Sequence, residues 1–207
     1  MSRVVYSFCQ AAAFLALTPY VRVRHFNVPD VGRLGGVLIA SNHQSFLDPP
    51  LIGMALPEPV HYLARADLFE APLLGRLLRA VNVHPIRRGQ ADVDALRTTI
   101  RILRAGRPLV LFPEGTRTPD GRLGRFRPGV GSLALRCGVP LLPVCIEGAF
   151  ECWPRWRRLP SPGRVAVLYG DLIRPHGRSA HELAEALRQS IAEMQVGLRE
   201  HLGRGTI

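Results

Sequence analysis

Short apolar runs alternate with amphipathic stretches along most of the chain. Six runs are nearly continuous in apolar or β-branched residues, as is typical of strands that are buried on both faces. These runs cover residues 37–41, 60–64, 83–86, 108–112, 141–146 and 165–169. Such alternation predicts an α/β fold, a single domain with a mostly parallel or mixed sheet flanked by helices.

Two helices are predicted from apolar residues that recur at steps of three and four. The first covers residues 92–104, and the second begins at a capping box of Ser179 and Glu182 and ends before Gly203. Their apolar stripes are Val93, Leu96, Ile100 and Leu103 in the first helix, and Leu183, Leu187, Ile191, Met194 and Leu198 in the second. In an open sheet of this kind, the chemistry is expected in loops at the strand ends.

The most apolar segment, residues 4–21, is close to the shortest length that spans a membrane. It is interrupted by polar residues and Pro19, and Arg22 and Arg24 follow it. An interfacial helix, a spanning helix, a cleaved signal peptide and a soluble helix that caps the core are all compatible with this pattern. We expect a membrane-associated helix over residues 1–24 and a second unit over residues 25–207.

The charge of the chain narrows the choice of partners. The 207 residues include 27 basic and 16 acidic ones, a net charge of +11, and every basic residue is an arginine. The 47% of apolar residues exclude a wholly disordered chain, and the lack of a second long uncharged apolar run excludes a polytopic membrane protein. The net charge favours a nucleic acid, an anionic membrane or a phosphorylated substrate. Free thiols and no metal site are expected from the spacing of Cys9, Cys137, Cys145 and Cys152.

A first group of polar residues follows the run 37–41 and reads Asn-His-Gln-Ser-Phe-Leu-Asp over residues 42–48. His43 can take a proton near neutral pH, and Asp48 can reach back across a tight turn to fix the tautomer of the ring. Pro49 and Pro50 prevent a helix from running through this turn. Alternatively, Asp48 is the N-cap of a helix that begins at Pro49, and His43 is an ordinary loop histidine.

A second group follows the run 108–112 and reads Phe-Pro-Glu-Gly-Thr-Arg-Thr over residues 112–118. Gly115 permits a turn that presents backbone amides, the Thr116 hydroxyl and the Arg117 guanidinium to one point. Arginine is suited to bidentate phosphate binding, and Glu114 could position Arg117 or accept a substrate hydroxyl. The alternative is an ordinary turn with a surface arginine.

The two motifs together, NHxSxxD and FPEGTRT, resemble those of the glycerolipid acyltransferase family, whose best-known members are 1-acylglycerol-3-phosphate acyltransferases. The resemblance covers roughly residues 35–150, and the segments 62–75, 85–89 and 139–144 look like further blocks of the family. Three features depart from the family pattern. Arg65 stands where lysine is frequent, Arg87 stands where an acidic residue is common, and residues 120–128 are unusually rich in arginine.

The resemblance implies a mechanism for these residues. His43 would be the general base, Asp48 would orient it and balance its charge, and the acceptor hydroxyl would attack the thioester without an acyl-enzyme. No GxSxG motif is present and no cysteine lies beside the histidine, which agrees with direct transfer. The residues implied in substrate binding are Arg88, Glu114, Gly115, Thr116 and Arg117.

The implied activity is transfer of a fatty acyl chain to 1-acylglycerol-3-phosphate, which gives phosphatidic acid in phospholipid biosynthesis. The donor would be acyl-CoA or acyl-carrier protein, with no further cofactor and no metal. The expected partners are the lysophospholipid, the donor and an anionic membrane surface, at the cytoplasmic face of the cell membrane. No nucleic acid is expected as a partner. Two alternatives are an acyltransferase for glycerol-3-phosphate or another lyso-lipid, and a non-catalytic basic protein that binds membranes or nucleic acid.

Two further segments combine apolar and basic residues. Residues 153–158 interleave both tryptophans with three arginines. Within residues 68–81, Leu73, Leu74, Leu77 and Leu78 accompany Arg76 and Arg79. Both compositions suit the headgroup region of a membrane. A solvated loop and a core helix are the alternatives.

Overall fold

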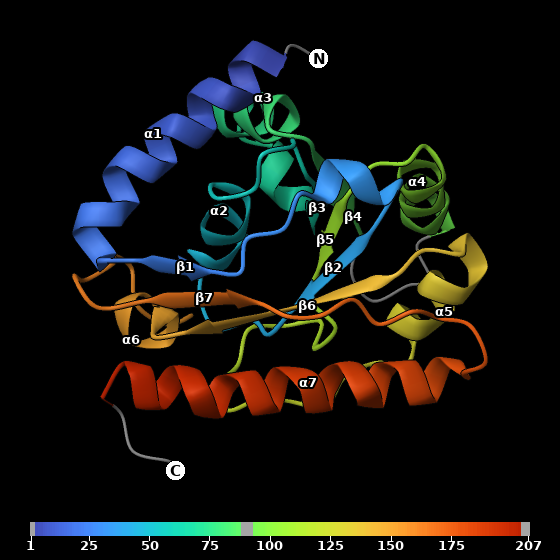
Figure 1. Cartoon of the computed structure of the whole chain (residues 1–207). Helices are drawn as coiled ribbons and strands as arrows, with labels where there is room; N and C mark the ends of the chain where they lie inside the picture. The colour runs from blue at the N-terminus through green and yellow to red at the C-terminus, as the bar shows by residue number, and fades with distance from the viewer. Residues whose placement is uncertain (1–2, 88–92, 204–207) are drawn as a thin grey trace.

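The centre of the molecule is a mixed seven-stranded sheet in the order β1-β7-β6-β2-β5-β3-β4, with helices on both faces (Figure 1). The computed structural model describes residues 3–87 and 93–203. The strands are β1 (Arg24–Phe26), β2 (Leu38–Ser41), β3 (His61–Arg65), β4 (Val83–Ile86), β5 (Leu109–Leu111), β6 (Leu141–Glu147) and β7 (Ala166–Tyr169). The predicted α/β fold is confirmed, and each of the six predicted strands is present.

Strand direction decides where the loops meet. From β6 through β2, β5 and β3 to β4, neighbouring strands are parallel, whereas β7 is antiparallel to β6 and β1 is parallel to β7. In the middle of the sheet, Ile39 lies between Val110 and Leu142. The carboxyl ends of β2, β3, β5 and β6 therefore lie at the same edge of the sheet, and both predicted motifs begin there.

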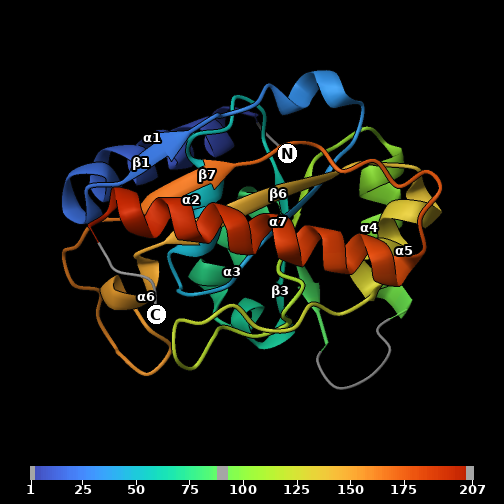
Figure 2. The same ribbon diagram turned by 60° about the horizontal axis from the view of Figure 1, so that its bottom comes forward.

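Helices cover the two faces of the sheet through two separate apolar clusters. One cluster involves α1 and α2, and the other involves α4, α5 and α7 (Figures 1 and 2). The helices are α1 (Arg3–Val21), α2 (Asp48–Gly53), α3 (Pro72–Ala80), α4 (Val93–Arg104), α5 (Gly129–Cys137), α6 (Ala149–Cys152) and α7 (Ala180–His201), with short 3-10 helices at Val31–Leu34 and Ala66–Phe69.

The last helix matches its prediction closely. Glu182 N donates to Ser179 Oγ at 3.2 Å, and Ser179 N donates to Glu182 Oε2 at 2.7 Å, which completes the capping box. Four residues of its predicted stripe are buried against the sheet: Leu183, Leu187, Ile191 and Leu198. At Gly131 of α5, an added Cβ would lie 2.1 Å from the Ala180 carbonyl oxygen. A side chain at this position would therefore push α5 and α7 apart.

The stripe predicted for the other helix is only partly correct. Leu103 is buried, but Val93 and Leu96 are exposed, and Ile102 and Thr99 are buried in their place. The helix packs on β4, β5 and α5 near the border of the sheet. Only its carboxyl-terminal half reaches the core there, so the first turns have no apolar surface to cover.

Helix α1 lies along the domain and does not project from it (Figure 1). Gln10 Nε2 donates to the carbonyl oxygens of Gly53 and Leu56, at 2.8 and 2.7 Å. The Tyr6 hydroxyl accepts a hydrogen bond from Val60 N at 3.1 Å. The opposite side of the helix exposes Val4, Val5, Phe8, Phe14 and Leu15. By length and composition α1 could cross a membrane.

Candidate active site

The loop between β2 and α2 places His43 against Asp48. His43 Nδ1 lies 2.7 Å from Asp48 Oδ2, and the same oxygen accepts hydrogen bonds from Gln44 N at 2.6 Å and Ser45 N at 2.8 Å. The Asp48 side chain is fully buried, whereas 17% of the His43 side chain is exposed. The Asp48 carboxylate thus stabilises the backbone turn and also orients the His43 imidazole.

The hydrogen bonds of Asp48 also define the state of the ring. Because Asp48 Oδ2 acts as an acceptor for two backbone N–H groups, the contact with His43 requires the hydrogen on Nδ1. The Nε2 atom then carries the lone pair that can accept a proton. Phe112 stacks on the imidazole with 3.9 Å between ring centroids and an interplanar angle of 16°, which fixes the plane of the ring. This arrangement suits a general base.

The second motif is bonded to the backbone of the histidine. Glu114 Oε1 accepts a hydrogen bond from His43 N at 2.9 Å, and Thr118 N donates to His43 O at 2.8 Å. Glu114 Oε2 accepts from Gly124 N at 3.2 Å. Burial raises the pKa of Glu114, and the two backbone donors oppose this rise. Glu114 therefore ties together three loops, a role that its sequence position alone does not reveal.

Asn42 fixes the start of the loop between β2 and α2 to the neighbouring strand. Its side-chain Nδ2 donates to Ile146 O, and its Oδ1 accepts from Ile146 N, both at 2.8 Å. The amide thereby imitates a backbone partner for β6 just beyond the end of β2. Nothing in the spacing of the motif indicated this function for Asn42.

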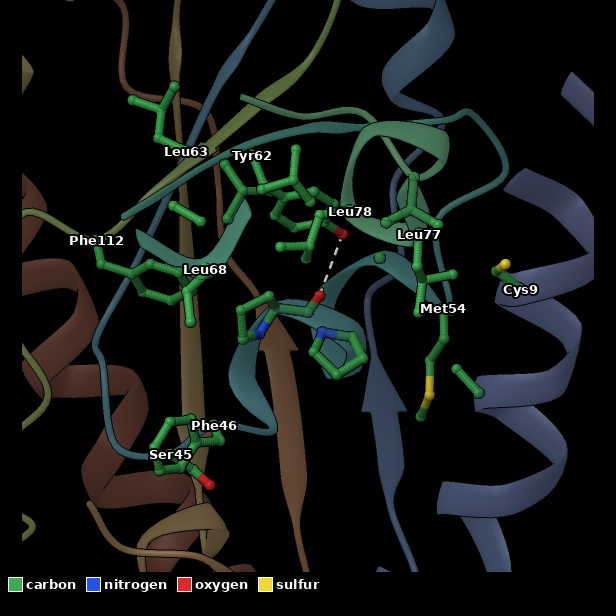
Figure 3. Close-up of a pocket in the computed structure, with 18 of the residues that line it drawn as sticks. Cys9, Ser45, Phe46, Met54, Tyr62, Leu63, Leu68, Leu77, Leu78 and Phe112 are labelled. Atoms are coloured by element: carbon green, nitrogen blue, oxygen red, sulfur yellow. Dashed lines mark hydrogen bonds between the residues drawn. The ribbon is translucent and has the colours of Figure 1, made fainter. Parts of the chain in front are cut away.

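A cavity of about 510 Å³ extends from this loop to α1. His43, Phe46, Phe112 and Arg117 line it at the end nearest the loop between β2 and α2. Figure 3 shows Phe46 and Phe112 at one end and Cys9 of α1 at the other. Most of the wall between them is apolar, and it includes Met54, Tyr62, Leu63, Leu68, Leu77 and Leu78. The volume is in the usual range for small-molecule sites, and the apolar wall suits a hydrocarbon chain.

Two arginines line this apolar cavity. Arg117 and Arg65 both line it, and Arg65 Nε also donates to Asp67 Oδ1 at 2.9 Å. Arg127 lies beside the turn of the second motif. A Cβ atom added at Gly115 would be only 3.0 Å from the Arg127 Cζ atom. The combination of an apolar wall and cationic groups suits an amphipathic anion.

The structure brings most of the predicted site residues together. His43, Asp48, Glu114 and Arg117 converge on one loop cluster, and Gly115 turns the chain with a φ of 75°. Gly115 and Thr116 are exposed. Arg88 lies outside the described residues.

The N-cap alternative for Asp48 is wrong. Asp48 is the first residue of α2, and its carboxylate bonds to residues before it. The two prolines occupy the first turn of the helix, where their missing N–H groups leave no helical hydrogen bond unmade. His43 is accordingly held by a carboxylate and is not an ordinary loop histidine.

Comparison with known proteins adds to this geometry. A chloroplastic 1-acyl-sn-glycerol-3-phosphate acyltransferase of Arabidopsis thaliana is 33% identical over 156 residues, which are 74% of this chain and 43% of that protein. The 1-acyl-sn-glycerol-3-phosphate acyltransferase of Bacillus subtilis (strain 168) is 27% identical over 199 residues, which are 92% and 97% of the two chains. The chain thus spans less than half the length of the plant relative and nearly all of the bacterial one.

The fold also matches a solved structure. The crystal structure of the 1-acyl-sn-glycerophosphate acyltransferase PlsC from Thermotoga maritima matches with a TM-score of 0.73 and 27% identity, over 99% of this chain and 88% of that one. The family model described as Acyltransferase matches residues 21–147, which include both motifs. On this match and on the likeness to these relatives, the chain belongs to the Acyltransferase family.

Proposed function

We propose that this protein transfers a fatty acyl chain from a thioester to the free hydroxyl of 1-acylglycerol-3-phosphate, giving phosphatidic acid. The observation that carries the proposal is the contact between the buried Asp48 and the partly exposed His43, beside Arg117 in an apolar cavity. The names of the Bacillus subtilis and Thermotoga maritima relatives support the same acceptor. The donor is acyl-CoA or acyl-carrier protein, with no other cofactor.

The proposed reaction follows from the orientation of the imidazole. His43 Nε2 takes the proton of the acceptor hydroxyl while the hydroxyl oxygen attacks the thioester carbonyl. The carbon–sulfur bond then breaks, and the leaving thiolate receives the proton from His43. Asp48 stabilises the imidazolium that exists between these two proton transfers. The acyl group thus passes directly from the donor to the acceptor, and no acyl-enzyme forms.

The charges at the cavity fit the phosphate of the acceptor. Arg117 lies at the catalytic end of the cavity, and its planar guanidinium can bind two phosphate oxygens at once. Arg65 also lines the cavity, where its guanidinium is paired with Asp67. Gly115, Thr116 and Arg88 remain predicted members of this phosphate site, and Glu114 shapes it through its hydrogen bonds to the backbone.

The test is a transfer assay with purified protein, with both CoA and carrier-protein thioesters as donors. The acceptors are 1-acylglycerol-3-phosphate, glycerol-3-phosphate and a lyso-lipid without a phosphate. The highest kcat/KM is expected for 1-acylglycerol-3-phosphate. A preference for another acceptor would replace the proposed substrate. Absence of transfer to every acceptor, together with binding to DNA or RNA, would favour a non-catalytic basic protein instead.

The variant Arg117→Ala tests the phosphate site. A hydrogen bond between charged groups contributes about 1.5–3 kcal/mol, so KM for 1-acylglycerol-3-phosphate should rise about 10- to 100-fold. Because the arginine binds ground state and transition state alike, kcat should change little. Arg136→Ala on α5 removes the same charge from an exposed position away from the cavity, and it should leave KM unchanged. An unchanged KM in Arg117→Ala would remove Arg117 from the phosphate site.

We also propose that the protein works at the cytoplasmic face of an anionic membrane. The outer side of α1 exposes Phe8 at 73% and Leu15 at 73%, and α3 exposes Leu73 at 82% and Leu77 at 49%. Both helices also contribute residues to the cavity wall, so their outer faces adjoin the site where the acyl chain would bind. This arrangement favours an interfacial α1 that lies on the membrane, because its other side is bonded to the domain.

The membrane proposal is tested with point variants. Deletion of residues 1–24 would also remove Val21 and Val23 from the core and the pairing of Arg24 with Ala166. We therefore choose Phe8→Ser with Leu15→Ser on α1, and Leu73→Gln with Leu74→Gln on α3. Leu74 is 41% exposed and, unlike Leu77, is not one of the residues that line the cavity. Each pair should weaken co-sedimentation with vesicles of phosphatidylglycerol and phosphatidylcholine by about tenfold or more. The control Val196→Ser changes an exposed residue of α7 and should bind like the unchanged protein. Normal vesicle binding by both double variants would place the membrane contact elsewhere.

A further inference from the structure

Phe46 lies in the loop between His43 and Asp48, and its ring contacts Arg117 of the second motif. The Arg117 guanidinium carbon lies 3.4 Å from the centroid of the Phe46 ring. Phe46 is 46% exposed and lines the cavity near Phe112 (Figure 3). Arg117 lines the same cavity. These two residues come from different motifs, 71 positions apart in the sequence.

Stacking on an aromatic ring restricts an arginine without using its hydrogen-bond donors. All five N–H groups of a guanidinium lie in its plane, whereas the contact with Phe46 is made by the flat face. An unsupported arginine loses considerable rotamer entropy when a ligand fixes it. A guanidinium that is already held in one plane loses less, so its ligand binds more tightly.

The ring of Phe46 is itself held in place. Ser45 N donates to Asp48 Oδ2 at 2.8 Å, and Ser45 Oγ donates to the Trp153 carbonyl oxygen at 2.8 Å. Leu47 N donates to Ser45 Oγ at 3.2 Å, so the backbone is fixed on both sides of Phe46. The Trp153 ring packs against the Phe46 ring with 5.1 Å between centroids. The support for the guanidinium is therefore rigid and belongs to the same loop as the catalytic base.

We propose that Phe46 is a positioning residue, whose ring holds the Arg117 guanidinium at the catalytic end of the cavity in the orientation that receives the acceptor phosphate. The inference rests on the proposed acyl transfer to a phosphate-bearing acceptor. It adds that the loop carrying His43 and Asp48 also orients Arg117, through the ring of Phe46, and thereby positions the phosphate. The contact between Phe46 and Arg117 thereby couples the position of the bound phosphate to the loop that carries the base.

The test begins with Phe46→Leu, which keeps an apolar side chain but removes the aromatic face. Cation–π contacts contribute about 0.5–2 kcal/mol, so KM for 1-acylglycerol-3-phosphate should rise about 3- to 30-fold with kcat nearly unchanged. Phe46→Tyr keeps the ring and should restore KM to within about twofold of the original value. The control Phe150→Leu removes a ring that packs on Trp156 and should leave KM unchanged.

A double-mutant cycle separates positioning from direct contact with the acyl chain. If Phe46 acts through Arg117, adding Phe46→Leu to Arg117→Ala should produce no further rise in KM for the acceptor. KM for the acyl donor should also stay the same in Phe46→Leu. Additive effects on KM, a raised KM for the donor, or failure of Phe46→Tyr to restore binding would each overturn the positioning role.

The results also distinguish this inference from the proposed function. A normal KM in Phe46→Leu, combined with a raised KM in Arg117→Ala, would refute the role of Phe46 and leave the phosphate site intact. A normal KM in Arg117→Ala would remove Arg117 from the phosphate site and would refute the role of Phe46, while the proposed acyl transfer is tested separately by the acceptor assay.

Discussion

Replacing His43 with alanine is expected to reduce kcat for acyl transfer by about 10²- to 10⁴-fold, the usual contribution of a general base. The imidazole Nε2 is the atom that the hydrogen bond between Nδ1 and Asp48 leaves to accept the hydroxyl proton. Without it, the neutral hydroxyl must attack the thioester unaided. The measurement is kcat under saturating donor and acceptor, with thermal unfolding of the same sample.

The fold should survive this change. The His43 backbone, and not its side chain, makes the hydrogen bonds to Glu114 and Thr118. The variant loses one side-chain hydrogen bond and the stacking on Phe112, so it should remain folded with a modestly lower melting temperature. His181→Ala on the exposed side of α7 serves as the matched control and should retain full activity. Retention of more than a tenth of the original kcat by His43→Ala would exclude this residue as the base.

Asp48→Asn should have an effect of similar size on kcat for a different reason. The amide oxygen of the new side chain can still accept from Gln44 N and Ser45 N, so the turn persists. The neutral amide carries no negative charge, so it no longer stabilises the imidazolium that forms during the transfer. We expect a loss of about 10²- to 10⁴-fold in kcat, with KM for both substrates nearly unchanged.

Asp48→Ala provides the structural comparison. It leaves two backbone N–H groups of a buried turn without their acceptor, at a cost of about 1–3 kcal/mol for each. Urea unfolding should therefore show Asp48→Ala to be less stable than Asp48→Asn, while both are nearly inactive. If Asp48→Asn kept normal kcat, the carboxylate would be only a structural anchor of the turn.

The sheet was largely predictable because its strands are buried runs. β1 was not predicted, because its three residues are partly exposed and the strand exists through pairing with β7. α5 was missed as well. Its glycines have low helix propensity, yet Gly131 is needed where the helix backbone meets Ala180. In both cases the element depends on a contact with a residue distant in the sequence, and the local sequence pattern does not show such a contact.

In the candidate site, too, contacts that are local in the sequence were predictable, whereas contacts that depend on strand pairing were not. The spacing of His43 and Asp48 predicted their contact, since a turn of five residues is a local feature. The positions of Phe46 over Arg117 and of Glu114 on the His43 backbone depend on how β2 and β5 pair, so they became visible only in three dimensions. Arg65 was noted as a departure from the family pattern, and its place in the cavity follows from the pairing of β3 with β5.

The positions of the cysteines have a chemical consequence for a thioester donor. Thiolates attack thioesters readily, so a sulfur near the reacting carbonyl would divert the acyl group onto the protein. Cys145 and Cys152 are fully buried, and burial raises the pKa of the Cys145 thiol. Cys137 lies on α5, and Cys9 lines the opposite end of the cavity from Phe112 (Figure 3). In the proposed reaction, the thioester carbonyl would lie beside His43, at the opposite end of the cavity from Cys9, and this separation would limit acylation of the Cys9 thiol.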